Sequence, residues 1–240
     1  MCLIAFAYRA HPRYPLVVVS NRDEFYDRPT RPADFWPDQP DILAGRDLLA
    51  GGTWFGVNRA GHWAAVTNFR EGRLAQPPRS RGELPTGFLG GNAAPAVYAR
   101  KVVDMGHEFS GFSLLAGTAD ELVYCSNLKD EVRRLAPGIY TLSNDFLDTP
   151  WPKAEHARDG LSRVLDSADL TTETLLAVLG ARAQFPDHRL PQTGVGIEME
   201  RTLSPAFIVG DTYGTRCTTV LAVDQNGHAP SVGHLDHLLD

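Results

Sequence analysis

The order of strand-like and helix-like segments is the strongest constraint on the fold of this chain. Apolar, β-branched or aromatic runs typical of strands occur at 2–8, 16–21, 204–211 and 215–224. The stretches 53–69 and 112–127 each contain two such runs around a short turn-like loop and are predicted to be β-hairpins. Helix-like spacing of apolar residues occurs at 82–89, 93–106, 151–168 and 171–184. Blocks of strands separated by blocks of helices indicate antiparallel sheets with helices outside them. We therefore predict an α+β fold that fits a four-layer αββα sandwich of two mainly antiparallel sheets, although the order also permits another α+β layout.

The chain length and the distribution of prolines bear on domain organisation. The 240 residues suffice for one substantial core, and no linker, repeat or low-complexity tract interrupts them. We predict a single domain over residues 1–240. The stretch 23–41 carries prolines at positions 29, 32, 37 and 40, which remove backbone donors, so an ordered surface loop is expected there.

Charge and cysteine usage exclude several classes of protein. The net charge of −6 argues against nucleic acid as the main partner. No apolar run is long enough to span a membrane, and no basic leader precedes the first apolar stretch. Cys2, Cys125 and Cys217 lie far apart and form no C-x-x-C pair, so we expect neither a metal site nor a disulfide framework. A reducing cytoplasm is the expected location.

Cys2 is the first candidate for chemistry. Removal of Met1 would leave a cysteine with both a thiol and a free α-amine. Since such an amine has a pKa of roughly 8, it can accept a proton near neutral pH and activate its own side chain. The alternative is a small residue buried in the core at the start of an apolar strand.

Four polar residues, Asn21-Arg22-Asp23-Glu24, follow the strongly apolar second strand. An arginine at a strand end can favour a thiolate, and a carboxylate can hold an α-ammonium by a charge-assisted hydrogen bond. The cluster is therefore a candidate rim of an active site. The alternative is a surface group of ion pairs in which Asp23 or Asn21 forms a turn or cap.

Three further polar residues border strand-like runs. Asn68 and Asn144 each follow such a run, where a side-chain amide or a nearby backbone N–H can bind an oxyanion. Each could equally form a turn. Arg216 begins a late strand and is a candidate for holding a substrate carboxylate, or else a surface strand arginine.

Several segments together resemble the NRDE-motif family, also called the transport and Golgi organisation family. They are the Met-Cys start, SNRDE, GGTWFGVN, AAVTNFRE, SRGELP, TLSND and YGTRCTTVL, in this order and over nearly the whole chain. The family is in turn similar to N-terminal-nucleophile (Ntn) hydrolases such as penicillin V acylase and bile salt hydrolase, which cleave linear amides. The resemblance thus implies the sandwich fold and an N-terminal cysteine nucleophile.

By motif, the resemblance carries catalytic roles over to Cys2, Arg22, Asp23, Asn144 and Arg216. It places Asn68 and the Phe69 backbone on the oxyanion side. The hydrolases have Arg-Asn-x-Asp where this chain has Asn-Arg-Asp-Glu, and a position-by-position overlay puts Asn21 and Glu24 in the Arg and Asp slots. Asn21, Glu24, Asn68 and Phe69 are therefore predicted substrate-binding residues.

Three functional hypotheses follow. The first is hydrolysis of a linear amide or thioester of a small or lipophilic acyl compound, with no required cofactor. The second, also implied by the resemblance, is non-catalytic intracellular binding of haem or of acyl-CoA and lipid. Because no C-x-x-C-H motif is present, haem would be a transient, non-covalent ligand with Cys2, His228, His234 or His237 as an axial ligand, unless these histidines are solvated residues of the tail. The third is a partner-binding module that uses the aromatic loop around Phe35-Trp36-Pro37 as a contact surface or lid, or simply packs it against the edge of the sandwich.

Overall fold

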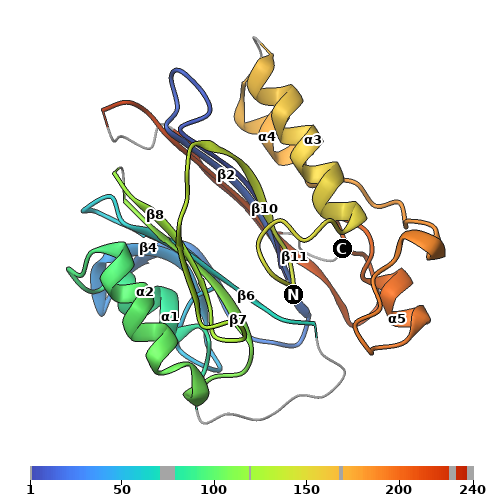
Figure 1. The fold of residues 1–240 in the computed structure, drawn as a ribbon, viewed down its shortest axis with the longest axis horizontal. Helices are drawn as coiled ribbons and strands as arrows, with labels where there is room; N and C mark the ends of the chain where they lie inside the picture. The colour runs from blue at the N-terminus through green and yellow to red at the C-terminus, as the bar shows by residue number, and fades with distance from the viewer. Residues whose placement is uncertain (1, 71–78, 119, 168–169, 227–230, 237–240) are drawn as a thin grey trace. The chain divides into compact units, whose positions relative to one another are not determined.

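The computed structural model of the chain describes residues 2–70, 79–118, 120–167 and 170–226, and the backbone of 231–236. The described strands form two antiparallel sheets, one of five strands and one of seven (Figure 1). Two compact units each contain one sheet. The first unit comprises the described residues of 2–27 and 137–236 with Arg70, and the second comprises 28–69 and 79–136. The predicted α+β class with two mainly antiparallel sheets is confirmed, and the single domain over 1–240 stays a prediction.

The five-stranded sheet of the first unit has the order β10-β1-β2-β11-β12. Its strands are β1 (Cys2–Tyr8), β2 (Leu16–Phe25), β10 (Gly138–Leu142), β11 (Tyr213–Val223) and β12 (Ser231–Asp236). The strands of 2–8 and 215–224 appear as predicted, whereas β2 runs four residues beyond the predicted end at Asn21. As a result, the whole Asn-Arg-Asp-Glu motif lies inside a strand, and strand pairing decides which face each of its side chains occupies.

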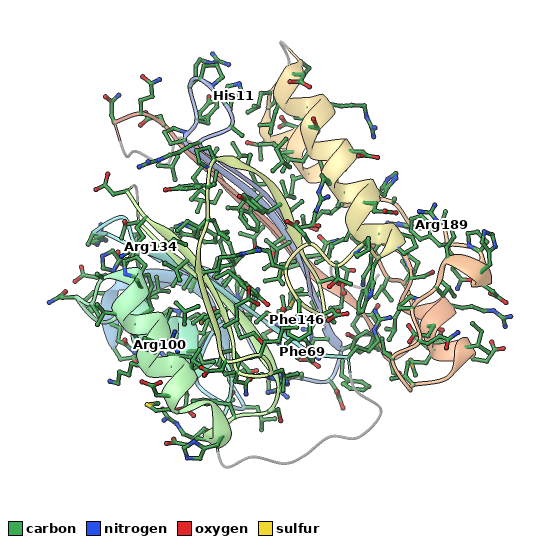
Figure 2. All side chains as sticks on the ribbon, in the orientation of Figure 1. His11, Phe69, Arg100, Arg134, Phe146 and Arg189 are labelled. Carbon is green, nitrogen blue, oxygen red and sulfur yellow. The ribbon has the colours of Figure 1, made fainter. Side chains whose placement is uncertain are left out.

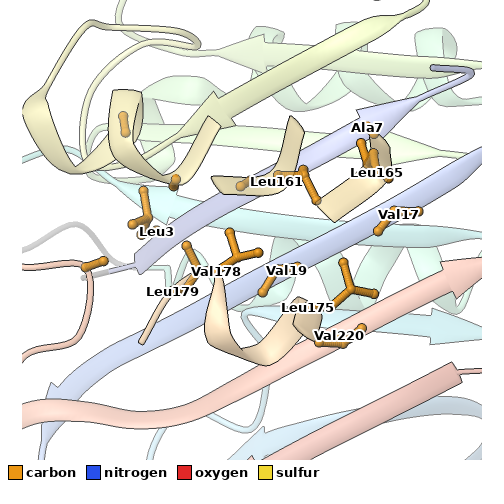
Figure 3. Packing of buried hydrophobic residues seen from close by; sticks show 14 of the residues in the cluster. Leu3, Ala7, Val17, Val19, Leu161, Leu165, Leu175, Val178, Leu179 and Val220 are labelled. Carbon is orange, nitrogen blue, oxygen red and sulfur yellow. The ribbon is translucent and has the colours of Figure 1, made fainter. Parts of the chain in front are cut away.

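Helices cover one face of this sheet. They are α3 (Pro152–Asp166) and α4 (Thr172–Ala177). The same unit also contains α5 (Ile197–Thr202) and a short 3-10 turn at Asp187–Arg189. Pro152 pre-sets the first turn of α3, and Ala154, Ala157, Leu161 and Leu165 recur at helical spacing on its buried side. These side chains pack on Leu3, Val19, Val220 and their neighbours (Figure 3). Burial of each large aliphatic side chain contributes about 1.5–3 kcal/mol.

The seven-stranded sheet of the second unit has the order β3-β4-β5-β6-β7-β8-β9. Its strands are β3 (Thr30–Trp36), β4 (Gln39–Asp47), β5 (Phe55–Asn58), β6 (Trp63–Asn68), β7 (Phe112–Gly117), β8 (Leu122–Ser126) and β9 (Glu131–Arg134). Both predicted hairpins are therefore confirmed. The helices α1 (Glu83–Leu89) and α2 (Pro95–Asp104), followed by a 3-10 turn at Gly106–Glu108, pack on it with apolar side chains. Arg100 lies on the exposed side of α2 and pairs with Asp130 (Figure 2).

The prediction of a surface loop over 23–41 is wrong, because β3 and most of the β3–β4 hairpin fall inside it. The prolines fit because the ladder is irregular where they occur. Pro32 lies in the register shift between Arg31 and Asp34 of an edge strand, and Pro40 lies in the shift beside Trp36. At both places a missing N–H removes no ladder bond.

The predicted strand at 204–211 is also absent. Its backbone groups form single hydrogen bonds to side chains and to backbone groups of different segments instead of a ladder, including the bond from the Thr215 N–H to the Ile208 carbonyl. The Ile208 N–H donates to the Thr215 hydroxyl at 2.9 Å, and the Ala206 carbonyl accepts from the Asn21 amide at 2.8 Å. No helix in the described part of the chain is both long and apolar enough to cross a membrane.

Candidate active site

Cys2 lies at the start of β1, next to Arg22 of β2. The two residues are directly opposed in the antiparallel ladder, and Arg22 in turn is opposed by Cys217 of β11. Opposed residues share a face of the sheet. Since Leu3 faces α3, alternation puts Cys2, Arg22 and Cys217 together on the face that these helices do not cover. Cys2 is only 7% exposed.

The charges around Cys2 act in opposite directions. Burial raises the pKa of the Cys2 thiol, the carboxylates of Asp23 and Glu24 raise it further, and the Arg22 guanidinium lowers it. Glu24 is on the same face as Arg22, with its Oε2 3.6 Å from Arg22 Nη2. Because the balance keeps the sulfur protonated at neutral pH, reaction at Cys2 requires a base.

Asn144 lies near Cys2 on the other neighbouring strand. It follows the end of β10 by two residues, and the β10–β1 register continued by two residues brings it level with Cys2. The Ser143 hydroxyl lies 3.3 Å from the Cys2 carbonyl oxygen and 3.4 Å from Asn144 Oδ1. The Asn144 carbonyl accepts the Arg70 N–H at 2.8 Å. Asn144 is buried, and its contacts with Ser143 and Arg70 fix the orientation of its amide. It lies beside Cys2 in a row that continues across the sheet to Arg22.

Asn21 and Asp23 occupy the helix-covered face of β2, opposite to that of Cys2. Asn21 Nδ2 donates to the Leu179 and Ala206 carbonyls at 3.0 and 2.8 Å, and Asn21 Oδ1 accepts from the Thr218 hydroxyl at 2.7 Å. These contacts tie β2 to the segments that follow α4 and α5. Asp23 is buried and its Oδ1 accepts from the Thr215 hydroxyl at 2.6 Å, one residue beyond the partner of Cys2.

Arg216 is the extra residue of a β-bulge. The β11–β2 register shifts between Thr215 and Cys217. The Arg216 guanidinium donates to the carbonyls of Phe25 and Tyr26 at 2.8 and 3.2 Å. These contacts place Arg216 at the outer end of β2, where it holds the backbone that leaves the strand.

Asn68 and Phe69 belong to the second unit. Asn68 ends β6, and its Nδ2 donates to the Phe69 carbonyl at 3.1 Å. The Phe69 N–H donates to the Gly111 carbonyl at 3.3 Å, and its ring is buried (Figure 2). Their oxyanion role stays a prediction.

The remaining predictions from the sequence concern aromatic residues and histidines. Trp36 is buried in the second unit and donates to the Ala44 carbonyl, whereas Phe35 is partly exposed beneath the Arg59 guanidinium. His228 and His237 lie outside the described residues, and only the backbone of His234 is described. Among the described side chains, no three His, Cys, Asp or Glu residues are grouped as metal ligands would be.

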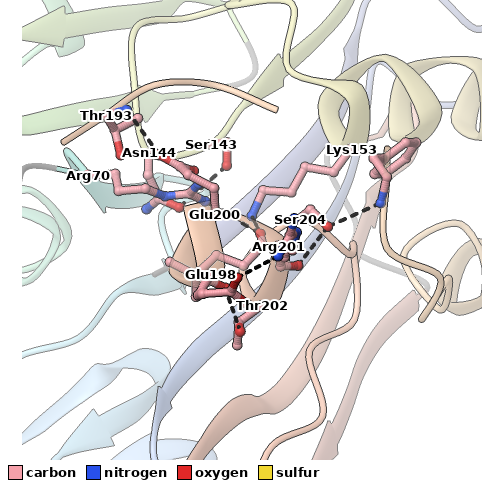
Figure 4. Close-up of polar contacts among 12 residues, drawn as sticks. Arg70, Ser143, Asn144, Lys153, Thr193, Glu198, Glu200, Arg201, Thr202 and Ser204 are labelled. Atoms are coloured by element: carbon pink, nitrogen blue, oxygen red, sulfur yellow. Dashed lines mark hydrogen bonds and ion pairs between the residues drawn. The ribbon is translucent and has the colours of Figure 1, made fainter. Parts of the chain in front are cut away.

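A buried charged cluster next to Asn144 was missed from the sequence (Figure 4). The Arg70 guanidinium stacks on Trp151 and forms an ion pair with Glu200, with Nη1 2.5 Å from Oε2. Lys153 Nζ donates to the Leu203 carbonyl at 3.1 Å, and Arg70 Nη2 approaches the same oxygen at 3.4 Å. Lys153 and Glu200 are each 2% exposed, and Arg70 is 7% exposed. The cluster joins α3, α5 and the segment that holds Asn144.

Burial and the nearby Arg70 lower the pKa of Lys153 to about 8, while Asp23, Cys2 and Glu200 act to raise it. One signal in the sequence pointed to this lysine. It lies in the first turn of α3, where the helix dipole disfavours a cation, so an exposed lysine there would be unusual. Arg70 occurs inside the AAVTNFRE segment, but its partner Glu200 lies 130 residues away, and no motif or spacing in the sequence connects the two residues.

The model of the family described as "Transport and Golgi organisation 2" matches residues 1–233. The chain belongs to this family. The Transport and Golgi organization protein 2 homolog of Homo sapiens is 36% identical over 250 residues, covering 95% of this chain and 90% of the human protein. The homolog of Mus musculus is 34% identical over 249 residues with the same coverage. A Transport and Golgi organisation 2 protein of Drosophila melanogaster is 25% identical and covers 93% of this chain and 88% of the fly protein.

Solved structures of Ntn hydrolases share the fold of this Transport and Golgi organisation 2 family member. The C2A mutant of conjugated bile acid hydrolase from Clostridium perfringens has a TM-score of 0.54 at 8% identity, covering 99% of this chain and 97% of that one. Penicillin V acylase from Agrobacterium tumefaciens has a TM-score of 0.51 at 12% identity, covering 97% and 86%. The Caenorhabditis elegans ortholog of N-acylethanolamine-hydrolyzing acid amidase has a TM-score of 0.51 at 11% identity, covering 92% of each chain. At these identities the likeness shows the fold alone.

Proposed function

We propose that this protein is an N-terminal cysteine amidohydrolase that cleaves a linear amide, or a thioester, of a small or lipophilic acyl compound. The observation that carries the proposal is the row formed by Asn144, Cys2 and Arg22 at one end of the five-stranded sheet. The names of the structural neighbours add support, since they denote an amidase, an acylase and a hydrolase, and one is a mutant at a cysteine in position 2.

The first half of the reaction forms a thioester. After Met1 is removed, the Cys2 α-amine takes the proton of the thiol, and the sulfur attacks the acyl carbon. The carbonyl oxygen then carries negative charge, which the Asn144 side-chain N–H stabilises by hydrogen bonding. When the C–N bond breaks, the α-ammonium gives its proton to the departing amine.

The second half regenerates the enzyme. A water molecule gives a proton to the α-amine and attacks the thioester carbon, the C–S bond breaks, and the proton returns to sulfur as the carboxylic acid leaves. Arg22 favours the thiolate at each stage by its fixed charge, and Asp23 holds the α-ammonium. Substrate-binding roles for Asn21, Glu24, Asn68 and Phe69, and a catalytic role for Arg216, remain predictions. Asn21 and Arg216 also have the structural contacts described above.

The mass of the purified protein is the first test. We expect the intact mass of a chain that starts at Cys2, and one covalent adduct per chain after treatment with a chloromethyl ketone of a simple acyl group. The adduct should be on the tryptic peptide 2–9, and Cys2→Ser should abolish both it and the release of 4-nitroaniline from short- and long-chain acyl 4-nitroanilides. Cys217→Ser, a matched change on the same face, should still hydrolyse these probes. A mature chain that keeps Met1 contradicts the mechanism.

Carriage of haem or of acyl-CoA and lipid is the competing hypothesis. A titration with haemin tests it, because an axial thiolate or imidazole shifts the Soret band. A shift in wild type that is lost in Cys2→Ser, without 4-nitroanilide hydrolysis, would favour carriage. We place either activity in the reducing cytoplasm, since Cys2, Cys125 and Cys217 are all free thiols in the described structure.

A further inference from the structure

A buried lysine lies beside the start of β1 and has no part in the mechanism above. Lys153 is 2% exposed, and among the described residues its Nζ donates to the Leu203 carbonyl and makes no ion pair with a carboxylate. An unpaired ammonium is costly to bury, since the carbonyl replaces only part of its hydration. A buried charge of this kind is a candidate for a functional group.

The charge of Lys153 interacts with groups at the start of β1 and in β2. Arg70 and Glu200 form their own ion pair, so their charges largely cancel. Asp23 and Cys2 lie within electrostatic range of Lys153, and their negative forms raise its pKa. Burial raises the pKa of Tyr213, as do Asp23 and Cys2, so this phenol stays neutral beside them. The charged and titratable groups that face Lys153 are Arg70, Asp23, Cys2 and Glu200.

We propose that Lys153 is a positioning residue that lowers the proton affinity of the Cys2 α-amine, so that this amine is a free base at neutral pH. The inference rests on the proposed function. Asp23 alone would hold the α-amine as an ammonium, because a carboxylate favours the charged form of its neighbour. A second cation beside the same carboxylate opposes that effect. Lys153 and the α-amine therefore compete for Asp23, and the amine stays able to accept the thiol proton.

Competitive labelling with acetic anhydride between pH 5 and 10 tests this, because it gives the pKa of an individual amine. The acetylated tryptic peptide 2–9 reports the Cys2 α-amine. In Lys153→Met, the α-amine pKa should rise by on the order of one unit relative to wild type. Lys153→Gln, which keeps a donor for the Leu203 carbonyl, should show the same rise. Lys101→Met, an exposed lysine of α2, should leave it unchanged.

The outcomes separate this inference from the proposed function. An α-amine pKa that is unchanged in both Lys153 variants, with Met1 removed, overturns the inference and leaves the hydrolase proposal standing. A labelled peptide that begins with Met1 overturns both. A purely structural role for Lys153 would change the melting temperature without moving the α-amine pKa.

Discussion

Replacing Lys153 by Met should stabilise the protein at neutral pH. One pKa unit corresponds to about 1.36 kcal/mol, so lowering the Lys153 pKa from 10.5 to about 8 costs the folded state about 3 kcal/mol at pH 7. Methionine has no charge to bury and fills a similar volume. The variant also loses the hydrogen bond from Lys153 to the Leu203 carbonyl, and this loss lowers the free energy of unfolding by about 1 kcal/mol. The expected net gain is about 2 kcal/mol at pH 7.

The sign of the pH dependence is the sharper part of this prediction. The folded pKa of Lys153 is below the unfolded one, so the unfolded state binds more protons between the two values. The penalty in wild type is complete below about pH 8 and fades as pH rises toward the unfolded value. The advantage of Lys153→Met should therefore shrink by about 1 kcal/mol between pH 7 and pH 9.

Urea unfolding followed by tryptophan fluorescence at pH 7, 8 and 9 measures this difference. Titration of groups whose pKa the substitution leaves unchanged cancels when the two free energies of unfolding are subtracted, and the expected rise in the Cys2 α-amine pKa acts in the same direction as the predicted decrease. Lys101→Met should change the free energy of unfolding by less than about 0.5 kcal/mol at each pH. If the difference in free energy of unfolding between Lys153→Met and wild type stays constant or grows with pH, the conclusion that Lys153 is buried with a lowered pKa is refuted.

Three further predictions concern stability. Glu200→Gln breaks the buried ion pair with Arg70 and should lower the free energy of unfolding by about 3 kcal/mol. Its control, Glu198→Gln, breaks an exposed pair on the same helix and should lower it by less than about 1 kcal/mol. Equal urea midpoints for the two variants would contradict this. Asn21→Ala removes three buried hydrogen bonds and should cost about 2–4 kcal/mol, and a loss near zero in urea would show that these bonds contribute nothing net. Leu161→Ala leaves a cavity under α3 and should cost about 3 kcal/mol by the same assay, unless the helix collapses onto the sheet.

Local patterns predicted much of the fold. The first strand, both hairpins and the positions of four of the five described helices follow from alternation, turn residues and helical spacing, which depend on near neighbours in the chain, although α4 ends at Ala177 and not at 184. The β3–β4 hairpin could not be read this way, because its prolines are tolerated only where a long-range ladder is already irregular. For the same reason the apolar run at 204–211 looked like a strand, although its backbone bonds to Asn21 and Thr215.

The sequence predicted which residues belong to the candidate site more fully than it predicted the face of the sheet on which each of them lies. Comparison of motifs placed Asn21 and Glu24 in the Arg and Asp slots, but the pairing of β1 with β2 sets Arg22 opposite Cys2 and turns Asn21 to the other face. A shift of one residue exchanges the two faces, so only the register of distant strands decides this. The partners of Arg70 and Lys153 come from segments that no spacing rule connects.

The bulge in β11 has a consequence for how relatives of this protein should be aligned. Thr215 pairs with Asp23, and Cys217 pairs with the adjacent Arg22, so Arg216 is surplus to the ladder. A relative could lack a residue at this point and keep every cross-strand neighbour in place. Such a relative would lose the Arg216 contacts to the Phe25 and Tyr26 carbonyls but not the strand pairing, and an alignment that forbids a gap here would match residues from opposite sides of the sheet.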